Sequence, residues 1–186
     1  MNESIKLILN RQSVRSYEAK PVAPEDVEII LECGKYAATA MGLQPWHFTV
    51  VRSREKLDKI TAENKRIMLE SGDERIKAMV NDPSFDNFRG APMAILVSGE
   101  INTPSAQADC AIATENMALA ANALGIASLF IGSFAPAFDG EKKEELKKEF
   151  GIPEGYKPYY ALSLGYRKGE LEERKPRREN LVNYVD

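Results

Sequence analysis

The chain is poor in the residues from which metal sites and catalytic triads are built. Its 186 residues include one histidine, His47, and two cysteines, Cys33 and Cys110. A single histidine gives metal clusters and Ser-His-Asp or Cys-His triads little to build on, so we expect no metal site. His47, next to Trp46, is expected to pack at a strand start. Two cysteines make no disulfide framework, which predicts a cytoplasmic location and core roles for both thiols.

A positive net charge and a long uninterrupted apolar run are also missing. The net charge of -3 disfavours a nucleic-acid or membrane-surface binder, because an acidic surface does not attract phosphates. The most apolar stretch, residues 106–132, is interrupted by acidic and amide side chains. It therefore predicts a buried helix followed by a strand and not a membrane span. Residues 1–6 have no long apolar core, so no secretory signal is expected.

Glycine-rich phosphate loops of the G-x-G-x-x-G and Walker types do not occur, so a bound phosphate would be held by side chains. The candidates are Arg11, Ser13 and Arg15, because the planar guanidinium binds phosphate oxygens in bidentate fashion. Exposed arginines stabilising a helix C-terminus would look the same, and these residues alone leave both interpretations open. A second basic group, residues 174–178, is by itself more typical of a solvated tail.

Helical and strand patterns alternate irregularly along the chain. Helices are expected at 2–10, from Pro24, at 53–69 after the cap Ser53, at 105–125 after the cap Ser105, and at 141–150 after the cap Asp139. Strands are expected at 47–51, 93–97, 126–131 and 159–165. Residues 93–97 are all apolar, which suits a strand covered on both faces. We predict one α+β domain over residues 1–186, with a mixed β-sheet sandwiched by helices.

Seven short motifs then occur in the order found in the FMN-dependent nitroreductase family, which the chain resembles nearly end to end. They are R-Q-S-V-R-S-Y at 11–17, P-V before the helix at 24, A-A-T-A-M-G-L-Q-P-W at 37–46, F-R-G-A-P at 88–92, L-G-I at 124–126, G-I-P-E-G-Y at 151–156 with L-G-Y at 164–166, and K-P-R at 175–177. Each motif alone is weak, and the seven in order are specific. An anion site without metal, triad or nucleotide loop also favours an enzyme whose cofactor carries the chemistry.

The resemblance implies FMN as cofactor and a homodimer with interlocked subunits. Arg11, Ser13 and Arg15 would contact the FMN phosphate and ribityl chain, and Gln12 would lie beside the flavin. Further members of the implied site are Lys175 and Arg177 at the anion, Thr39, Ala40, Met41 and Gly42 at the partner's flavin, Gly132 and Ser133 with backbone N–H groups at the isoalloxazine edge, and Asn64 near its pyrimidine end.

Three positions depart from the family pattern. Ala38, Thr39 and Gly42 stand where the family has Pro, Ser and Asn. The change at Gly42 removes a side-chain amide close to the flavin and frees the backbone. These departures affect the expected choice of substrate more than cofactor binding.

The implied activity is hydride transfer from NADH or NADPH through flavin N5 to a nitroaromatic, a quinone or a similar conjugated acceptor, by a ping-pong mechanism. No catalytic side chain is then expected, because flavin N5 carries the chemistry. The alternatives are a flavin-dependent reductive dehalogenase or flavin-fragmenting enzyme of the same fold, a flavin store or sensor without turnover, and a helical interaction protein without flavin. The alanine-rich helix and residues 181–185 are expected at the subunit interface.

Overall fold

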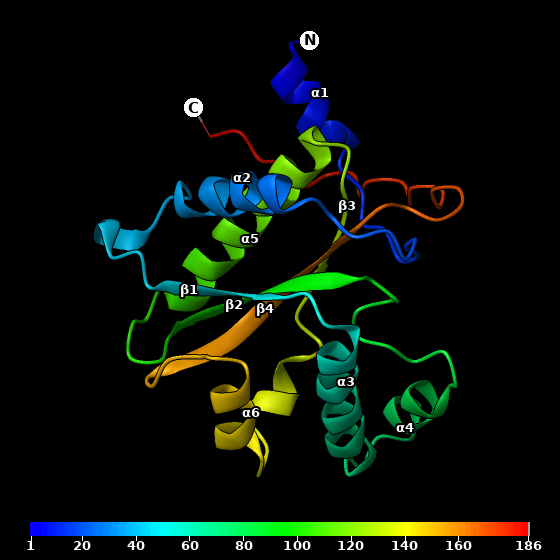
Figure 1. The fold of residues 1–186 in the computed structure, drawn as a ribbon. Coiled ribbons are helices and arrows are strands. Elements are labelled where there is room, and N and C mark those ends of the chain that lie inside the picture. Colours follow the sequence, from blue (N-terminus) through cyan, green and yellow to red (C-terminus); the bar gives the residue numbers. More distant parts are fainter. Residues whose placement is uncertain (186) are drawn as a thin grey trace.

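Four strands form one sheet in the order β1-β2-β4-β3 in the computed structural model, which describes residues 1–185 (Figure 1). The strands are β1 (Trp46–Val51), β2 (Met93–Glu100), β3 (Ala127–Ile131) and β4 (Tyr156–Gly165). Every neighbouring pair is antiparallel. The predicted α+β class is confirmed, but parallel pairing in the described residues is limited to a bridge between Ser13 and Ser128. The predicted mixed pairing of the strands is wrong, because the long helical connections return the chain antiparallel.

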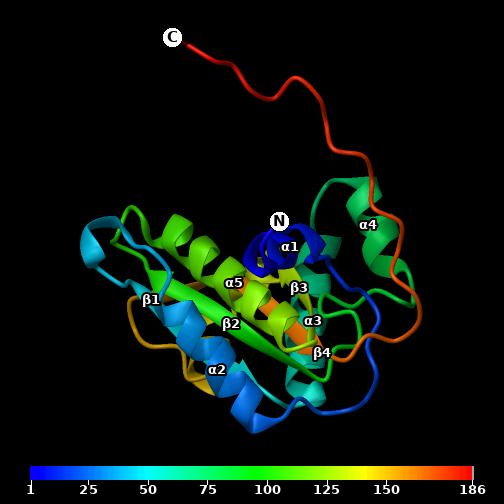
Figure 2. The same ribbon diagram turned by 90° about the horizontal axis from the view of Figure 1, so that it is seen from above.

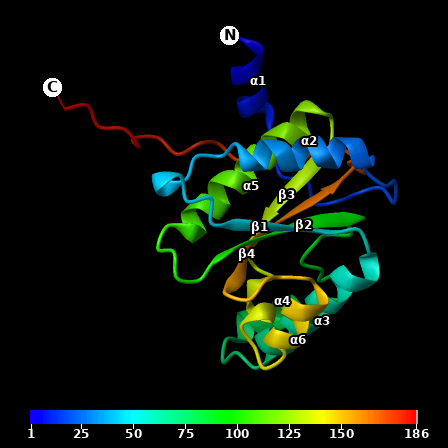
Figure 3. The same ribbon diagram turned by 60° about the vertical axis from the view of Figure 1, so that its left-hand side comes forward.

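Helices cover both faces of this sheet, as Figures 1 and 3 show. One side carries α1 (Glu3–Asn10), α2 (Pro24–Lys35) and α5 (Ala106–Ala123). The other side carries α3 (Arg54–Leu69), α4 (Glu74–Asn81) and α6 (Lys143–Glu149). Two short 3-10 turns, η1 (Ala40–Gly42) and η2 (Ala135–Phe138), complete the structure.

The side chains of β2 divide the interior into two cores. Met93, Ile95 and Val97 belong to the cluster formed with α2 and α5. Ala94 and Leu96 belong to the cluster formed with α3, η2 and α6. Successive strand residues point to opposite faces, so a strand between two helical layers must be apolar throughout. This confirms the interpretation of the continuous apolar run.

Local signals explain several helix ends. Pro24 is the first residue of α2, and the Ser53 hydroxyl accepts a hydrogen bond of 3.3 Å from the Lys56 N–H at the start of α3. Alpha-helices α2 and α5 approach closely at Gly34, where an added Cβ would lie 2.8 Å from Cγ of Met117. The short side chains on both helices therefore permit their close packing.

Other predicted details are wrong. Ser105 precedes α5 without capping it, because its hydroxyl donates to the Asp109 carboxylate at 2.9 Å. Asp139 does not cap α6, since it closes η2 and pairs with Lys157 at 3.0 Å, so the helix begins at Lys143. Helix α4 was not predicted, although the Asp73 carboxylate caps it by accepting a hydrogen bond of 2.8 Å from the Arg75 N–H.

The two cysteines differ in burial. Cys110 is buried in α5, and desolvation raises the pKa of its thiol to about 12. Cys33 is half-buried, so its predicted core role is met only in part. His47 is half-buried and packs edge-on against Tyr156. Among residues 1–185, no helix combines the length and the apolar character that crossing a bilayer requires.

Candidate functional site

The first predicted segment lies along the edge strand β3. The Val14 N–H donates to the Ser128 carbonyl at 2.9 Å, and Ser13 forms the bridge to Ser128. The Tyr17 hydroxyl donates to the Val14 carbonyl at 2.9 Å, and both side chains are buried. In extended chain, alternate residues point to opposite sides, so burial of Val14 turns Ser13 and Arg15 away from the core. The strand edge thus fixes the backbone of the basic segment.

This segment and the chain after residue 171 enclose a hollow of about 440 Å³. It brings together six of the residues predicted from sequence: Arg11, Gln12, Ser13, Arg15, Lys175 and Arg177. Arg174 also lines the hollow, together with Glu172 and Glu173. Five cationic side chains therefore face two carboxylates, a local excess of three positive charges. Such a wall of guanidinium, ammonium and hydroxyl donors suits a phosphate dianion.

Two of these arginines pair with acidic side chains. Arg15 lies 3.2 Å from Glu172, and Arg11 lies 3.1 Å from Glu115 on α5. The Glu172 side chain is 71% exposed, and exposed ion pairs contribute about 0–1 kcal/mol. A bound anion can therefore exchange with Glu172 at small cost, because the carboxylate returns to water.

Arg174 organises the hollow, a role that the sequence analysis did not assign. Its Nε donates to the Gln12 side-chain oxygen at 2.9 Å, and its Nη2 donates to the Arg11 carbonyl at 3.1 Å. The same guanidinium binds the carbonyls of Leu9 and Asn10 at the end of α1. Carbonyls at a helix end lack partners inside the helix and attract cations. The contact joins residues 162 positions apart, so no local pattern announces it.

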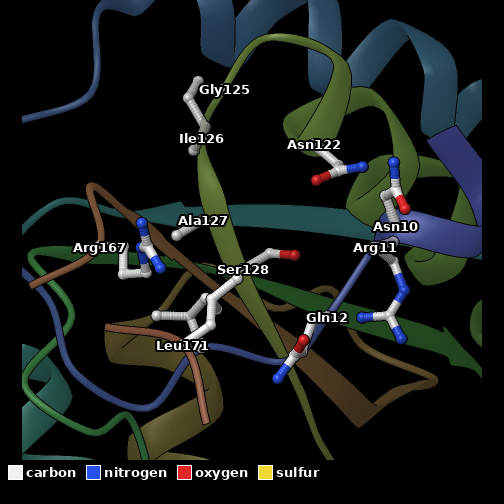
Figure 4. A pocket seen from close by; sticks show the side chains of 11 residues that line it. Asn10, Arg11, Gln12, Asn122, Gly125, Ile126, Ala127, Ser128, Arg167 and Leu171 are labelled. Carbon is white, nitrogen blue, oxygen red and sulfur yellow. The ribbon is translucent and has the colours of Figure 1, made fainter. Parts of the chain in front are cut away.

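A second hollow of about 210 Å³ adjoins the first and shares Arg11 and Gln12 with it. Figure 4 shows Arg167 beside Ala127 and Ser128, with Asn122 across the space. Arg167 directly follows the L-G-Y motif, but the sequence analysis gave it no role. It adds another cation near the strand edge.

The far end of β3 carries the second predicted group. Gly132 and Ser133 follow the strand and are exposed, whereas Asn64 in α3 is fully buried. The Asn64 amide donates to the Ser133 carbonyl at 2.8 Å and to the Asn87 side-chain oxygen at 3.1 Å. Asn87 in turn donates to the Ser133 hydroxyl at 3.2 Å. Asn64 and Ser133 are thus brought together, and Asn87 is a member that sequence reasoning missed.

Both groups lie along one strand. Ser128, which bridges Ser13, is four residues from Gly132 in the sequence, which corresponds to roughly 13 Å of extended strand. The structure therefore offers a cationic hollow at one end of β3 and the exposed residues Gly132 and Ser133 at the other. That spacing suits an elongated ligand with a phosphate at one end.

The third predicted group, residues 39–42, does not join the others within one chain. Figures 2 and 3 place this loop beyond the end of α2, away from the start of the basic segment. Met41 and Gln44 have left-handed φ values of 53° and 50°, and Met41 is 88% exposed. The Ala40 N–H donates to the buried Asp109 carboxylate at 3.3 Å. The loop is therefore a strained, exposed projection held by α5.

The chain is similar to known proteins in sequence and in fold. The model of the Nitroreductase family matches residues 8–166. A provisionally named NADH dehydrogenase/NAD(P)H nitroreductase of Archaeoglobus fulgidus is 36% identical over 173 residues, covering 92% of this chain and 90% of that protein. The chain belongs to the nitroreductase family, a family of oxidoreductases, as its motifs predict.

Solved structures agree over the full length. A nitroreductase with bound FMN from Bacteroides fragilis has a TM-score of 0.93 at 33% identity, with 100% of both chains covered. A nitroreductase with bound FMN from Desulfitobacterium hafniense has a TM-score of 0.90 at 30% identity, again with 100% of both chains covered. Within residues 1–185, no group of three or more His, Cys, Asp or Glu side chains is placed to hold a metal ion.

Proposed function

We propose that this protein is an FMN-dependent oxidoreductase that passes electrons from NADH or NADPH to a small conjugated acceptor such as a nitroaromatic or a quinone. The observation that carries the proposal is the cationic hollow beside β3, in a chain whose relatives of 33% and 30% identity hold FMN. Relatives named as NAD(P)H nitroreductases support the choice of reductant.

The donor set fits FMN on chemical grounds. Arg11, Arg15, Lys175 and Arg177 would bind the terminal phosphate, and Ser13 and Gln12 would contact the ribityl chain and the flavin. Gly132 and Ser133 would offer backbone N–H groups to the ring edge. The strand length between Ser128 and Gly132 is comparable with the reach of a five-carbon ribityl phosphate. Asn64 would act near the pyrimidine end of the flavin through its hydrogen bond to the Ser133 carbonyl.

When bound, FMN would supply the redox chemistry, taking a hydride at N5 and passing it on in a ping-pong sequence. The side chains of this protein would bind, orient and neutralise charge. The pyridine nucleotide and the acceptor would occupy the same face in turn. We therefore expect the residues around the flavin ring to determine which electron acceptors the enzyme reduces. No acid–base pair is expected to take part in that choice.

A homodimer is part of the proposal. The first helix α1 has no buried residue, and Ile5, Ile8 and Leu9 are about half exposed. Leu181, Val182, Tyr184 and Val185 are exposed as well, and the chain carrying them leads away from the sheet in Figure 2. Exposed apolar surface of this extent marks an interaction site. We propose that residues 181–185 lie at the subunit interface. The alanine-rich helix α5, which contacts α1, is proposed to lie there as well.

The loop at residues 39–42 then gains a function. Thr39, Ala40, Met41 and Gly42 project away from their own chain's hollow, so they would line the flavin of the partner.

We further propose that residues 1–186 form a single domain, although residue 186 lies outside the described residues. The cytoplasmic location stays a prediction.

The visible spectrum of the purified protein tests the cofactor. Yellow protein, or uptake of added FMN by colourless protein, is expected, and failure of both would overturn the proposal. Bleaching by NADH or NADPH followed by recovery with menadione or nitrofurazone is expected for the enzyme. Flavin that binds but is never reduced would indicate a store or sensor.

Light scattering on the holoprotein should give a dimer, and a monomer that holds FMN tightly would contradict the shared site.

A further inference from the structure

The buried amide of Asn64 has only one orientation compatible with its surroundings. Two acceptors that cannot be reversed face its Nδ2, the Ser133 carbonyl at 2.8 Å and the Met68 sulfur at 3.3 Å, and the same Nδ2 donates to the Asn87 Oδ1 at 3.1 Å. A reversed amide would set an oxygen against those acceptors. The Asn64 Oδ1 has no hydrogen-bond partner among residues 1–185, although the residue is fully buried. The orientation is thus retained at the expense of an unsatisfied acceptor.

The orientation of Asn64 determines that of Asn87. The Asn87 Oδ1 accepts from Asn64, so its Nδ2 must face Ser133, whose Oγ lies 3.2 Å away. The Ser133 oxygen is therefore an acceptor in this contact. A hydroxyl has one hydrogen to donate besides its two lone pairs. That hydrogen is not used by Asn87 and can serve an acceptor on the exposed side of the turn.

We propose that Asn64 and Asn87 are positioning residues that turn the Ser133 hydroxyl outward as a hydrogen-bond donor to the bound cofactor. The inference rests on the proposed function and adds a side-chain donor to the backbone N–H groups expected at Gly132 and Ser133. A donor aimed at the ring edge stabilises the reduced flavin more than the oxidised flavin, because reduction adds electron density there. The chain Asn64–Asn87–Ser133 therefore raises the reduction potential of the cofactor.

Two substitutions separate this role from simple packing. Ser133→Ala removes the hydroxyl and keeps the backbone N–H. Asn87→Asp keeps the size of the side chain and its bond from Asn64, but it presents an acceptor to Ser133, which turns the hydroxyl hydrogen inward. Each substitution is expected to lower the two-electron midpoint potential of bound FMN by up to about 30 mV, the equivalent of a tenfold change.

The double variant corrects for the added charge. Asn87→Asp is expected to lower the potential more when Ser133 is present than in the Ser133→Ala background, where only the negative charge acts. Ser133→Thr keeps a hydroxyl and should keep the wild-type potential. Ser84→Ala is the matched control for Ser133→Ala, because it removes one serine hydroxyl, bonded at 2.6 Å to the Asp82 carboxylate, at an exposed position outside the site.

The potentials are measured on the holoproteins by dye equilibration, and thermal unfolding of the FMN-free proteins reports on folding. An unchanged potential in Ser133→Ala would overturn the inference. So would an equal effect of Asn87→Asp in both backgrounds. If Asn87→Asp fails to fold, Ser133→Ala against Ser133→Thr decides alone. A wild-type protein that binds no FMN contradicts the proposed function instead, which keeps the two failures distinct.

Discussion

The basic segment at residues 11–17 and the loop at residues 39–44 are both proposed to face a flavin, but they are held in opposite ways. The segment is bonded to β3 through Val14 and anchored by the buried Tyr17. The loop is exposed, has left-handed residues at Met41 and Gln44, and is tied to α5 by the Asp109 carboxylate. Rigid support suits a segment that would always bind the same phosphate group. Sparse support suits a loop that would contact different electron acceptors.

The largest effect is expected in the rigidly held basic segment, on the affinity for FMN. Arg15→Ala removes a guanidinium from the anion hollow and leaves the buried anchors in place. A charge-assisted hydrogen bond contributes about 1.5–3 kcal/mol, so the Kd for FMN should rise about 10- to 100-fold. Equilibrium titration of the FMN-free protein, followed by flavin fluorescence, measures it. Arg52→Ala, an exposed arginine at the end of β1, is the control and should leave the Kd unchanged.

The next largest effect is expected at Asp109, which holds the loop at residues 39–44. Asp109 is 3% exposed and accepts from the Ala40 N–H and the Ser105 hydroxyl. Asp109→Ala should cost about 1–3 kcal/mol of unfolding free energy, because both donors lose a charged acceptor. Urea unfolding gives the stability, and amide exchange at Ala40 should become faster. Glu154→Ala, which removes an exposed acid, should change neither quantity. Unaltered exchange at Ala40 would mean that the loop is held by something other than Asp109.

The anchor of the segment predicts a smaller effect that depends on pH. Burial raises the pKa of Tyr17 above its ordinary value, and the nearby Arg15 charge opposes this only in part. Because the folded-state pKa is higher, the contribution is complete below about pH 10 and decreases above it by about 1.4 kcal/mol per pH unit. Tyr17→Phe should cost about 1 kcal/mol at neutral pH, through loss of the bond to Val14, and lack the alkaline decrease.

Unfolding free energies at pH 7 to 11 measure this difference. Both proteins share the alkaline contribution of Cys110, whose pKa is raised to about 12 by burial, so the difference isolates Tyr17. Parallel pH profiles of the two proteins would contradict the assigned role of the phenol.

The smallest effect is expected for Gly42→Asn, at the tip of the loop. Gly42 has a φ of +68°, and nothing lies within 4 Å of an added Cβ. Asn, which the family pattern has there, tolerates this backbone, so Gly42→Asn should change stability by no more than about 0.5 kcal/mol. Gly42→Val should cost about 1–2 kcal/mol, because a branched side chain is strained at positive φ. Urea unfolding distinguishes them, and equal stabilities would show that the loop relaxes freely.

Sequence patterns were sufficient to predict those parts of the fold that depend on residues close together in the chain. Pro24 and Ser53 set helix starts through their own chemistry, and the apolar residues 93–97 required two covered faces. Patterns failed where a competing partner decided the outcome: Ser105 turned to Asp109 and Asp139 to Lys157 instead of capping helices. In the site, motifs grouped Arg11, Ser13 and Lys175. They could not reveal Arg174 or Asn87, whose roles depend on contacts between distant segments.

The contact between Gln12 and Arg174 also has a kinetic consequence. It closes a loop of 162 residues, and such a closure is favourable only after β3 and β4 have paired and brought the segments together. We therefore predict that the cationic hollow forms late in folding, after the rate-limiting step. A ligand bound there would slow unfolding and leave the folding rate unchanged, because it stabilises contacts absent from the transition state. The proposed cofactor would then stabilise the folded protein without helping it to fold.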